Sequence, residues 1–149
     1  MCDTQGVHLF SVCDGHGQYG HLASQYIKDS LTAKINDHLK KDPEFLLSTP
    51  AFHERVPEYL RNTFLDTHSE LMFQEKYDCN LSGSTVCAVL FDSKKVYCAN
   101  AGDSRAVLFS QGKKQTIKVT PISEDHKPSL PNEKKRVLSM NGRVEPIKA

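Results

Sequence analysis

The chain has 149 residues, a formal net charge of +1 and a hydrophobic fraction of 38%. This length and composition suit one globular domain that buries a sizeable core. The near-neutral charge gives no global field to attract nucleic acid, and no apolar run approaches the roughly 20 residues that span a bilayer. We therefore expect neither a nucleic-acid partner nor a membrane segment.

Cysteine usage and the first residues bear on the compartment. None of the five cysteines stands in a C-x-x-C arrangement, so neither a zinc clip nor a redox motif is indicated. The opening sequence MCDTQGVHLF has neither the basic leader nor the long apolar stretch of a signal peptide. These features favour a reduced intracellular protein, in the cytoplasm, the nucleus or both.

The first elements in chain order are a strand and a helix. Residues 7–13 (VHLFSVC) form a short apolar run that the glycines of residues 14–17 (DGHG) end. From Gly20 to about Lys40 an apolar residue recurs at every fourth position, which predicts an amphipathic helix. The repeating residues are Ala23, Ile27, Leu31, Ile35 and Leu39. Asp42-Pro43 is expected to end this helix.

A second helix is predicted over about residues 51–75, where apolar residues again line one side. Pro57 falls inside this range. Proline lacks an N–H and suits only the first turn of a helix. The helix could therefore begin near Pro57 as readily as near Ala51.

The second half of the chain changes to the period of strands. Four short strands are expected at residues 85–91, 96–101, 105–109 and 116–120, and their short turns predict an antiparallel meander. A final helix is expected to begin near Pro131 and to stop at Asn141-Gly142. Residues 143–145 are a candidate start for another strand. This order predicts an α+β fold with helices packed against antiparallel sheet, in one domain over residues 1–149.

Residues 14–17 hold the sharpest chemical signal. Asp14 follows a strand expected to be buried, so a rigid element would hold its carboxylate as a metal ligand requires. Gly15 permits a tight turn that offers its carbonyl as a second oxygen donor, and such donors suit Mg²⁺ or Mn²⁺ better than zinc. His16 is a residue type that exchanges protons near neutral pH and can protonate a leaving group. The alternative is an ordinary turn that ends a strand.

Residues 99–105 (ANAGDSR) are the second signal. Small residues lead to a tight turn between two apolar strands, with Asp103 at its tip. Its carboxylate could reach a metal ion held by Asp14. The alternative is a hairpin turn in which Asp103 bonds to local amides.

Three further features favour structural roles. The backbone amides of residues 82–85 (SGST) could cradle a phosphate, but this segment lacks the lysine and spacing of a Walker loop. Residues 124–128 (EDHKP) could in principle form a metal cluster, but a polar loop before the last helix is expected. The remaining scattered histidines are interpreted as surface or packing residues: His8, His21, His38, His53 and His68.

The order of these motifs resembles one known family. FSVCDGHG (residues 10–17), SGST (82–85), ANAGDSR (99–105), DHKP (125–128) and NEKKRV (132–137) follow one another as in the type 2C (PPM) metal-dependent protein serine/threonine phosphatases. The resemblance covers about residues 7–144, with the spacing typical of the family. It implies a four-layer α/β/β/α sandwich with antiparallel sheets.

The resemblance also implies chemistry and a substrate. Asp14 would bridge two Mg²⁺ or Mn²⁺ ions, the Gly15 carbonyl would bind one of them, and Asp103 would hold a third, weaker ion. Water activated by two metal ions would hydrolyse phosphoserine and phosphothreonine in phosphoproteins, and His16 would protonate the departing oxygen.

The sequence departs from the family pattern at both ends. The family places a phosphate-binding arginine and a Glu-Asp pair before the first strand, and an Asp-Gly-x-x-Asp segment and an Asp-Asn pair after the matched region. Residues 1–149 contain none of these, so we expect a partial phosphatase domain, a fragment in preference to a short natural relative. We expect it to be weakly active or inactive alone. The alternative is a non-catalytic interaction module on the same fold, against which the intact Asp14, His16 and Asp103 argue.

Overall fold

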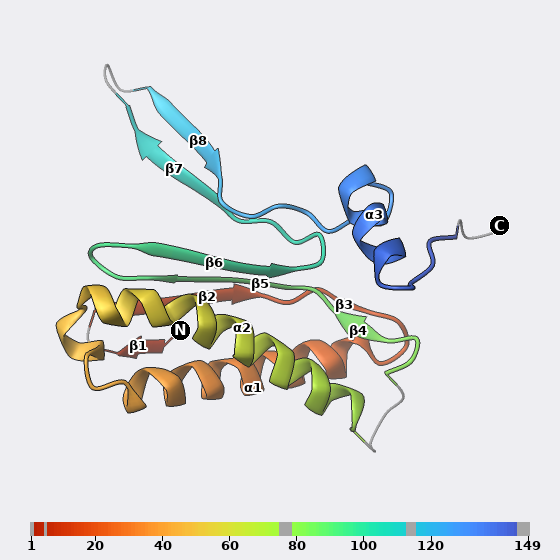
Figure 1. Ribbon diagram of the computed structural model, residues 1–149, viewed down its shortest axis with the longest axis horizontal. Helices are drawn as coiled ribbons and strands as arrows, with labels where there is room; N and C mark the ends of the chain where they lie inside the picture. The colour runs from red at the N-terminus through yellow and green to blue at the C-terminus, as the bar shows by residue number, and fades with distance from the viewer. Residues whose placement is uncertain (1, 5, 75–78, 113–115, 146–149) are drawn as a thin grey trace.

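The computed structural model describes residues 2–4, 6–74, 79–112 and 116–145. Its largest sheet has four antiparallel strands in the order β1-β2-β5-β6, and two long helices, α1 and α2, cover one face of it (Figure 1). The strands of this sheet are β1 (Cys2–Thr4), β2 (Val7–Val12), β5 (Val86–Phe91) and β6 (Val96–Ala101). The other elements are β3 (Gly15–His16), α1 (Gly20–Lys41), the short 3-10 helix η1 (Phe45–Leu47), α2 (Pro50–Met72), β4 (Gly83–Ser84), β7 (Val107–Gln111), β8 (Ile117–Pro121) and α3 (Pro131–Ser139).

The predicted α+β class is confirmed, and the core lies between the two long helices and the sheet. Each of the five apolar residues repeating along α1 is buried, as the four-residue period predicts. From the sheet, alternate residues of β5 face them: Val86, Ala88 and Leu90. These contacts account for two layers, a helical one and a sheet. The four-layer sandwich stays a prediction.

Helix α2 begins at Pro50, seven residues before Pro57, so the alternative start near Pro57 is wrong. Thr49 caps the helix by accepting a hydrogen bond from the Phe52 N–H at 3.2 Å. Pro57 lies inside the helix, where its missing N–H leaves the His53 carbonyl without the usual donor four residues on. The Tyr97 hydroxyl from β6 donates to that carbonyl at 3.2 Å. The helix continues because the sheet supplies the missing bond. Residue 75, its predicted end, lies outside the described residues.

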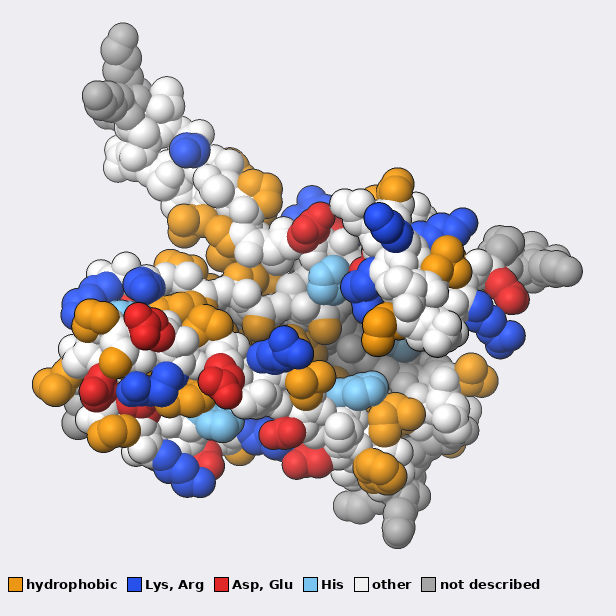
Figure 2. Space-filling view, viewed as in Figure 1, with side chains coloured by type: hydrophobic (Ala, Val, Ile, Leu, Met, Phe, Trp, Pro, Cys, Tyr) orange, Lys and Arg blue, Asp and Glu red, His pale blue; other side chains and the backbone are white. Residues whose placement is uncertain are grey.

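The predicted four-strand meander is wrong in its pairing. β5 pairs with β6 and also with β2, while β7 and β8 pair only with each other within the described residues. They form a hairpin that projects away from the helices (Figure 1). Figure 2 shows hydrophobic side chains gathered on this hairpin. Its exposed apolar residues are Val107, Leu108, Phe109, Ile117 and Val119. The chain leaves β6 at Gly102, whose φ of +99° redirects the backbone.

Smaller differences occur at the strand ends. β1 was not predicted, yet its register pairs Cys2 with Leu9 and Thr4 with Val7. Gly15 and His16, expected in a turn, form β3 and pair with β4. No strand begins at residues 143–145, which are described without regular structure. They follow the predicted helix stop, which is confirmed because the Gly142 N–H donates to the Val137 carbonyl at 2.9 Å.

Candidate active site

Asp14 lies between β2 and β3, where Thr85 fixes its backbone. The Asp14 N–H donates to Thr85 Oγ1 at 3.1 Å, and the Thr85 N–H donates to the Asp14 carbonyl at 2.9 Å. The Asp14 side chain is exposed. Within the described part of the chain no hydrogen bond or ion pair engages its carboxylate. A fixed backbone that carries a free carboxylate is the arrangement that a metal ligand needs.

The loop of Asp103 meets the same threonine. Thr85 Oγ1 lies 2.7 Å from Ser104 Oγ, at hydrogen-bond distance. Gly102 packs so closely here that a Cβ on it would lie 2.7 Å from Thr85 Cγ2. Thr85 therefore joins two loops that are far apart in sequence. The Asp103 side chain between Gly102 and Ser104 is 51% exposed.

Glycine is required at Gly15 for a reason other than the expected tight turn. A Cβ there would lie 2.1 Å from the Gly20 carbonyl oxygen at the start of α1, which no side chain tolerates. Gly17 has a φ of +78° and turns the chain into α1. This close packing holds Asp14 and His16 against the first turn of a long helix.

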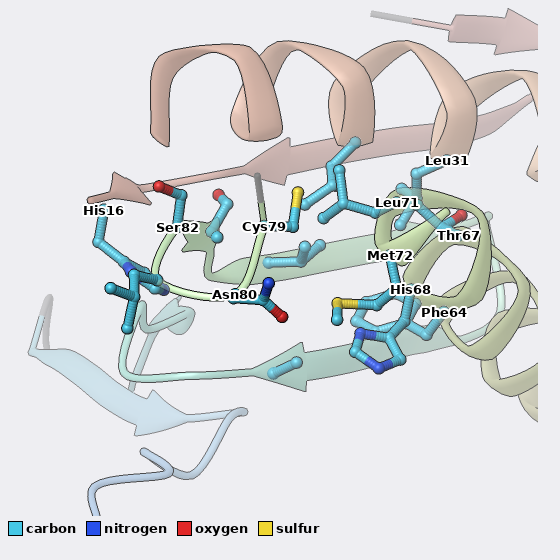
Figure 3. Close-up of a pocket in the computed structure, with 16 residues that line it drawn as sticks. His16, Leu31, Phe64, Thr67, His68, Leu71, Met72, Cys79, Asn80 and Ser82 are labelled. Atoms are coloured by element: carbon cyan, nitrogen blue, oxygen red, sulfur yellow. The ribbon is translucent and has the colours of Figure 1, made fainter. Parts of the chain in front are cut away.

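His16 lies over β4. A Cβ at Gly83 would be 3.1 Å from His16 Nε2, so the imidazole uses the space left by that glycine. The side chain is exposed, and it borders a pocket that also contacts Ser82 (Figure 3). The Ser82 hydroxyl accepts a hydrogen bond from the Tyr19 N–H at 3.1 Å. In residues 82–85, for which a structural role is predicted, Ser82 and Thr85 are the connecting side chains.

An ion-pair network lies beside Asp103. Arg105 donates two hydrogen bonds of 2.9 Å to Asp125, whose side chain is only 8% exposed. The guanidinium lowers the pKa of the Asp125 carboxyl, and Lys127 adds to the effect. Lys127 Nζ lies 3.4 Å from Asp125 and 3.8 Å from Asp103. The network holds residues 124–128, predicted to be a polar loop, next to Asp103.

The oxygen donors present suit Mg²⁺ or Mn²⁺ in kind. They are the Asp14 carboxylate, the Gly15 carbonyl and the Asp103 carboxylate. In number they fall short, because no group of three or more His, Cys, Asp or Glu side chains among the described residues is placed to hold a metal ion. The nearby ammonium of Lys127, 3.8 Å from Asp103, is an ion-pair partner of that carboxylate.

Comparison with known proteins identifies the family of this chain. A sequence model described as protein phosphatase 2C matches residues 3–148. The chain belongs to the protein phosphatase 2C family. It is 34% identical over 142 residues to a rice protein (Oryza sativa subsp. japonica) described as probable protein phosphatase 2C 52, covering 95% of this chain and 25% of the relative. It is 33% identical over 142 residues to the Arabidopsis thaliana probable protein phosphatase 2C 76, covering 95% of this chain and 30% of that one.

Solved serine/threonine phosphatase structures share the fold. A serine-threonine phosphatase 2C from Toxoplasma gondii superposes with a TM-score of 0.65 at 21% identity, over 90% of this chain and 45% of that chain. The Mycobacterium tuberculosis serine/threonine phosphatase PstP gives a TM-score of 0.58 at 21% identity, over 98% of this chain and 56% of that one. This chain spans about a quarter to two fifths of the length of the curated relatives it matches.

Sequence reasoning selected Asp14, Gly15, His16 and Asp103, and the structure brings the two loops that carry them together at Thr85. It missed Thr85 itself and the pairing of Arg105 with Asp125. A signal for that pair was present, since both residues stand in the motifs that carry the family resemblance. The distance between them in sequence, 20 residues, hid the contact.

None of the described helices is long and apolar enough to cross a membrane.

Proposed function

We propose that this chain forms part of the catalytic site of a metal-dependent protein serine/threonine phosphatase that acts on phosphoserine and phosphothreonine in intracellular phosphoproteins. The observation that carries the proposal is the junction at Thr85, which joins the Asp14 loop to the Asp103 loop through hydrogen bonds of 3.1 Å and 2.7 Å. Membership of the protein phosphatase 2C family supports the same activity.

Each candidate residue has a role that its position permits. Asp14 and Asp103 present exposed carboxylates to divalent cations, and the Gly15 carbonyl is a further oxygen donor in the same loop. When bound, such ions activate water and neutralise phosphoryl charge. His16 lies two residues from Asp14 on β3, with its imidazole exposed. It would donate a proton to the serine or threonine oxygen as that oxygen leaves phosphorus.

The number of oxygen donors limits what the isolated chain can do. Mg²⁺ gives up its waters reluctantly and is held firmly only by a nearly complete set of ligands. Two carboxylates on neighbouring loops would bind it weakly. We therefore propose that residues 1–149 alone bind Mn²⁺ or Mg²⁺ weakly and release phosphate slowly or not at all.

The test uses Mn²⁺ as a paramagnetic probe in NMR spectra of the ¹⁵N-labelled chain. We expect Mn²⁺ to broaden the amide signals of both loops selectively, and Asp14→Asn to abolish that broadening. Asp66→Asn is the matched control because Asp66 is an exposed carboxylate on α2, an element that carries neither loop. Broadening that is spread evenly, or that survives Asp14→Asn, would refute the proposed metal site.

Phosphate release from a phosphothreonine peptide is measured on the same samples. Rapid Mn²⁺-dependent release would contradict the expected weak activity and would leave the function itself standing if Asp14→Asn removed it. Selective peptide binding without Mn²⁺ and without turnover would favour the alternative, a non-catalytic interaction module on this fold.

A further inference from the structure

A cavity of about 390 Å³ lies beside the candidate active site. It is bounded by α1, by the C-terminal half of α2 and by the segment that leads into β4 (Figure 3). Its volume falls within the roughly 300–1,000 Å³ that is usual for small-molecule sites. None of the catalytic roles proposed above uses its interior.

The two ends of the cavity differ in chemistry. Leu31, Phe64 and Leu71 supply apolar surface from the two helices at one end, while His16 and Ser82 lie at the other (Figure 3). Thr67 and His68 of α2 add polar groups beside the apolar surface. Ser84 of β4 adds a second hydroxyl to the lining. No Lys, Arg, Asp or Glu is among the described residues that line it. From these described residues a formally charged ligand would gain no opposite charge to offset its lost hydration, which disfavours its binding.

We propose that this cavity binds an uncharged small molecule with an apolar body and one hydrogen-bonding end. The apolar body would lie against Leu31, Phe64 and Leu71, where burial of apolar surface drives binding. The polar end would face the imidazole of His16 and the serine hydroxyls, which provide both donors and acceptors.

An occupant of the cavity contacts the structural support of the candidate site. β3 and β4 pair with each other, Gly15 with Ser84 and His16 with Gly83, and both strands border the cavity. A bound molecule would restrict the His16 side chain and thereby alter its access to a leaving oxygen. This regulatory consequence depends on the proposed phosphatase function, whereas the binding itself does not.

Methyl NMR tests the binding with 2-naphthol, an uncharged two-ring alcohol, as the probe. Met72 and Ile27 line the cavity, and their methyl signals are expected to shift along one saturable curve. Met140 and Ile117 are 75% and 73% exposed and lie outside it, so they serve as internal controls. The His16 ring signals should follow the same curve.

A pair of matched variants locates the site. Ala101→Leu adds volume at the cavity wall and should weaken 2-naphthol binding about tenfold or more, because a filled site cannot also hold the ligand. Ala33→Leu makes the same change at an exposed position of α1 and should leave binding unchanged. If Ala101→Leu does not fold, the titration of the unmodified chain decides alone.

Three results would overturn the proposal. They are the absence of a saturable shift at Met72 and Ile27, equal shifts at Met140 and Ile117, and unchanged affinity in a folded Ala101→Leu variant. The titration needs no metal ion and no turnover. Its outcome is therefore independent of the Mn²⁺ experiment, and either proposal can fail while the other stands.

Discussion

The junction at Thr85 gives the sharpest prediction about the candidate site. Thr85→Val keeps the shape of the side chain and removes the hydroxyl that accepts from Asp14 at 3.1 Å and pairs with Ser104 at 2.7 Å. Each such bond contributes roughly 0.5–1.5 kcal/mol net. Asp14 is exposed and Ser104 is half-buried, so water can partly replace the lost partners. We expect a loss of about 1–2 kcal/mol in the free energy of unfolding, the lower half of the summed range.

Urea denaturation measures that loss, and thermal melting should show a fall in Tm of about 3–6 °C for a chain of this size. The variant should also weaken the selective Mn²⁺ broadening, because the two carboxylates would no longer be held beside each other. Thr85→Ser retains the hydroxyl and should keep that broadening close to the unmodified level. The reasoning is refuted if Thr85→Val matches Thr85→Ser in both stability and Mn²⁺ broadening.

A second threonine provides a control of opposite sign. Thr63 on α2 is fully buried, and its hydroxyl has no hydrogen-bond partner among the described residues. Thr63→Val removes a buried polar group that makes no bond, so it should leave stability unchanged or raise it. A loss similar to that of Thr85→Val would show that the threonine-to-valine exchange itself, and not the junction, is being measured.

Two further predictions concern stability elsewhere in the molecule. Gly102→Ala should lower the free energy of unfolding by about 1–3 kcal/mol because it combines a positive φ with a clash against Thr85. Gly6→Ala, at a position with positive φ and open space, should cost less. Equal losses would exclude the clash as a cause. Hydrogen bonds from Arg55 and then Tyr59 lower the pKa of the buried Asp42 carboxyl despite its desolvation. The carboxylate therefore stabilises the fold fully above about pH 4, and this stabilisation is lost as the pH falls below that value. Because Arg55 is 37% exposed, Asp42→Asn should lower the free energy of unfolding by about 2–4 kcal/mol at pH 7 and by less at pH 3. A loss of stability that does not change with pH would contradict this.

The helices show how far local patterns determine the fold. Helix α1 could be predicted almost to the residue because its apolar period and its end at Asp42-Pro43 agree. In α2 the rule that proline breaks a helix conflicts with the apolar period around it. The sheet resolves the conflict, since Tyr97 supplies the hydrogen bond that Pro57 cannot make. A partner 44 residues away is invisible to any local pattern.

The sheets show where local patterns fail. Short apolar segments joined by turns were expected to pair in sequence order, and β5 and β6 do so with Val86 opposite Ala101. After β6 this pairing order stops. The Asn100 side chain donates hydrogen bonds to the Gly102 and Glu124 carbonyls, and Arg105 pairs with Asp125. These contacts hold residues 102–106 against a later loop instead of against β6. Pairing of β2 with β5 likewise depends on long-range packing that the strand signals do not encode.

The candidate site separates stability from function in a way that the sequence alone does not show. The backbones near Asp14 and Asp103 are fixed by Thr85, Ser104 and close glycine contacts, while both carboxylates stay exposed. A carboxylate that takes no part in holding the fold can be exchanged for an amide with little effect on stability. The same exchange removes a charge that a divalent cation needs. Loss of Mn²⁺ binding without loss of stability in Asp14→Asn, together with loss of both in Thr85→Val, would distinguish a metal ligand from the residue that positions it.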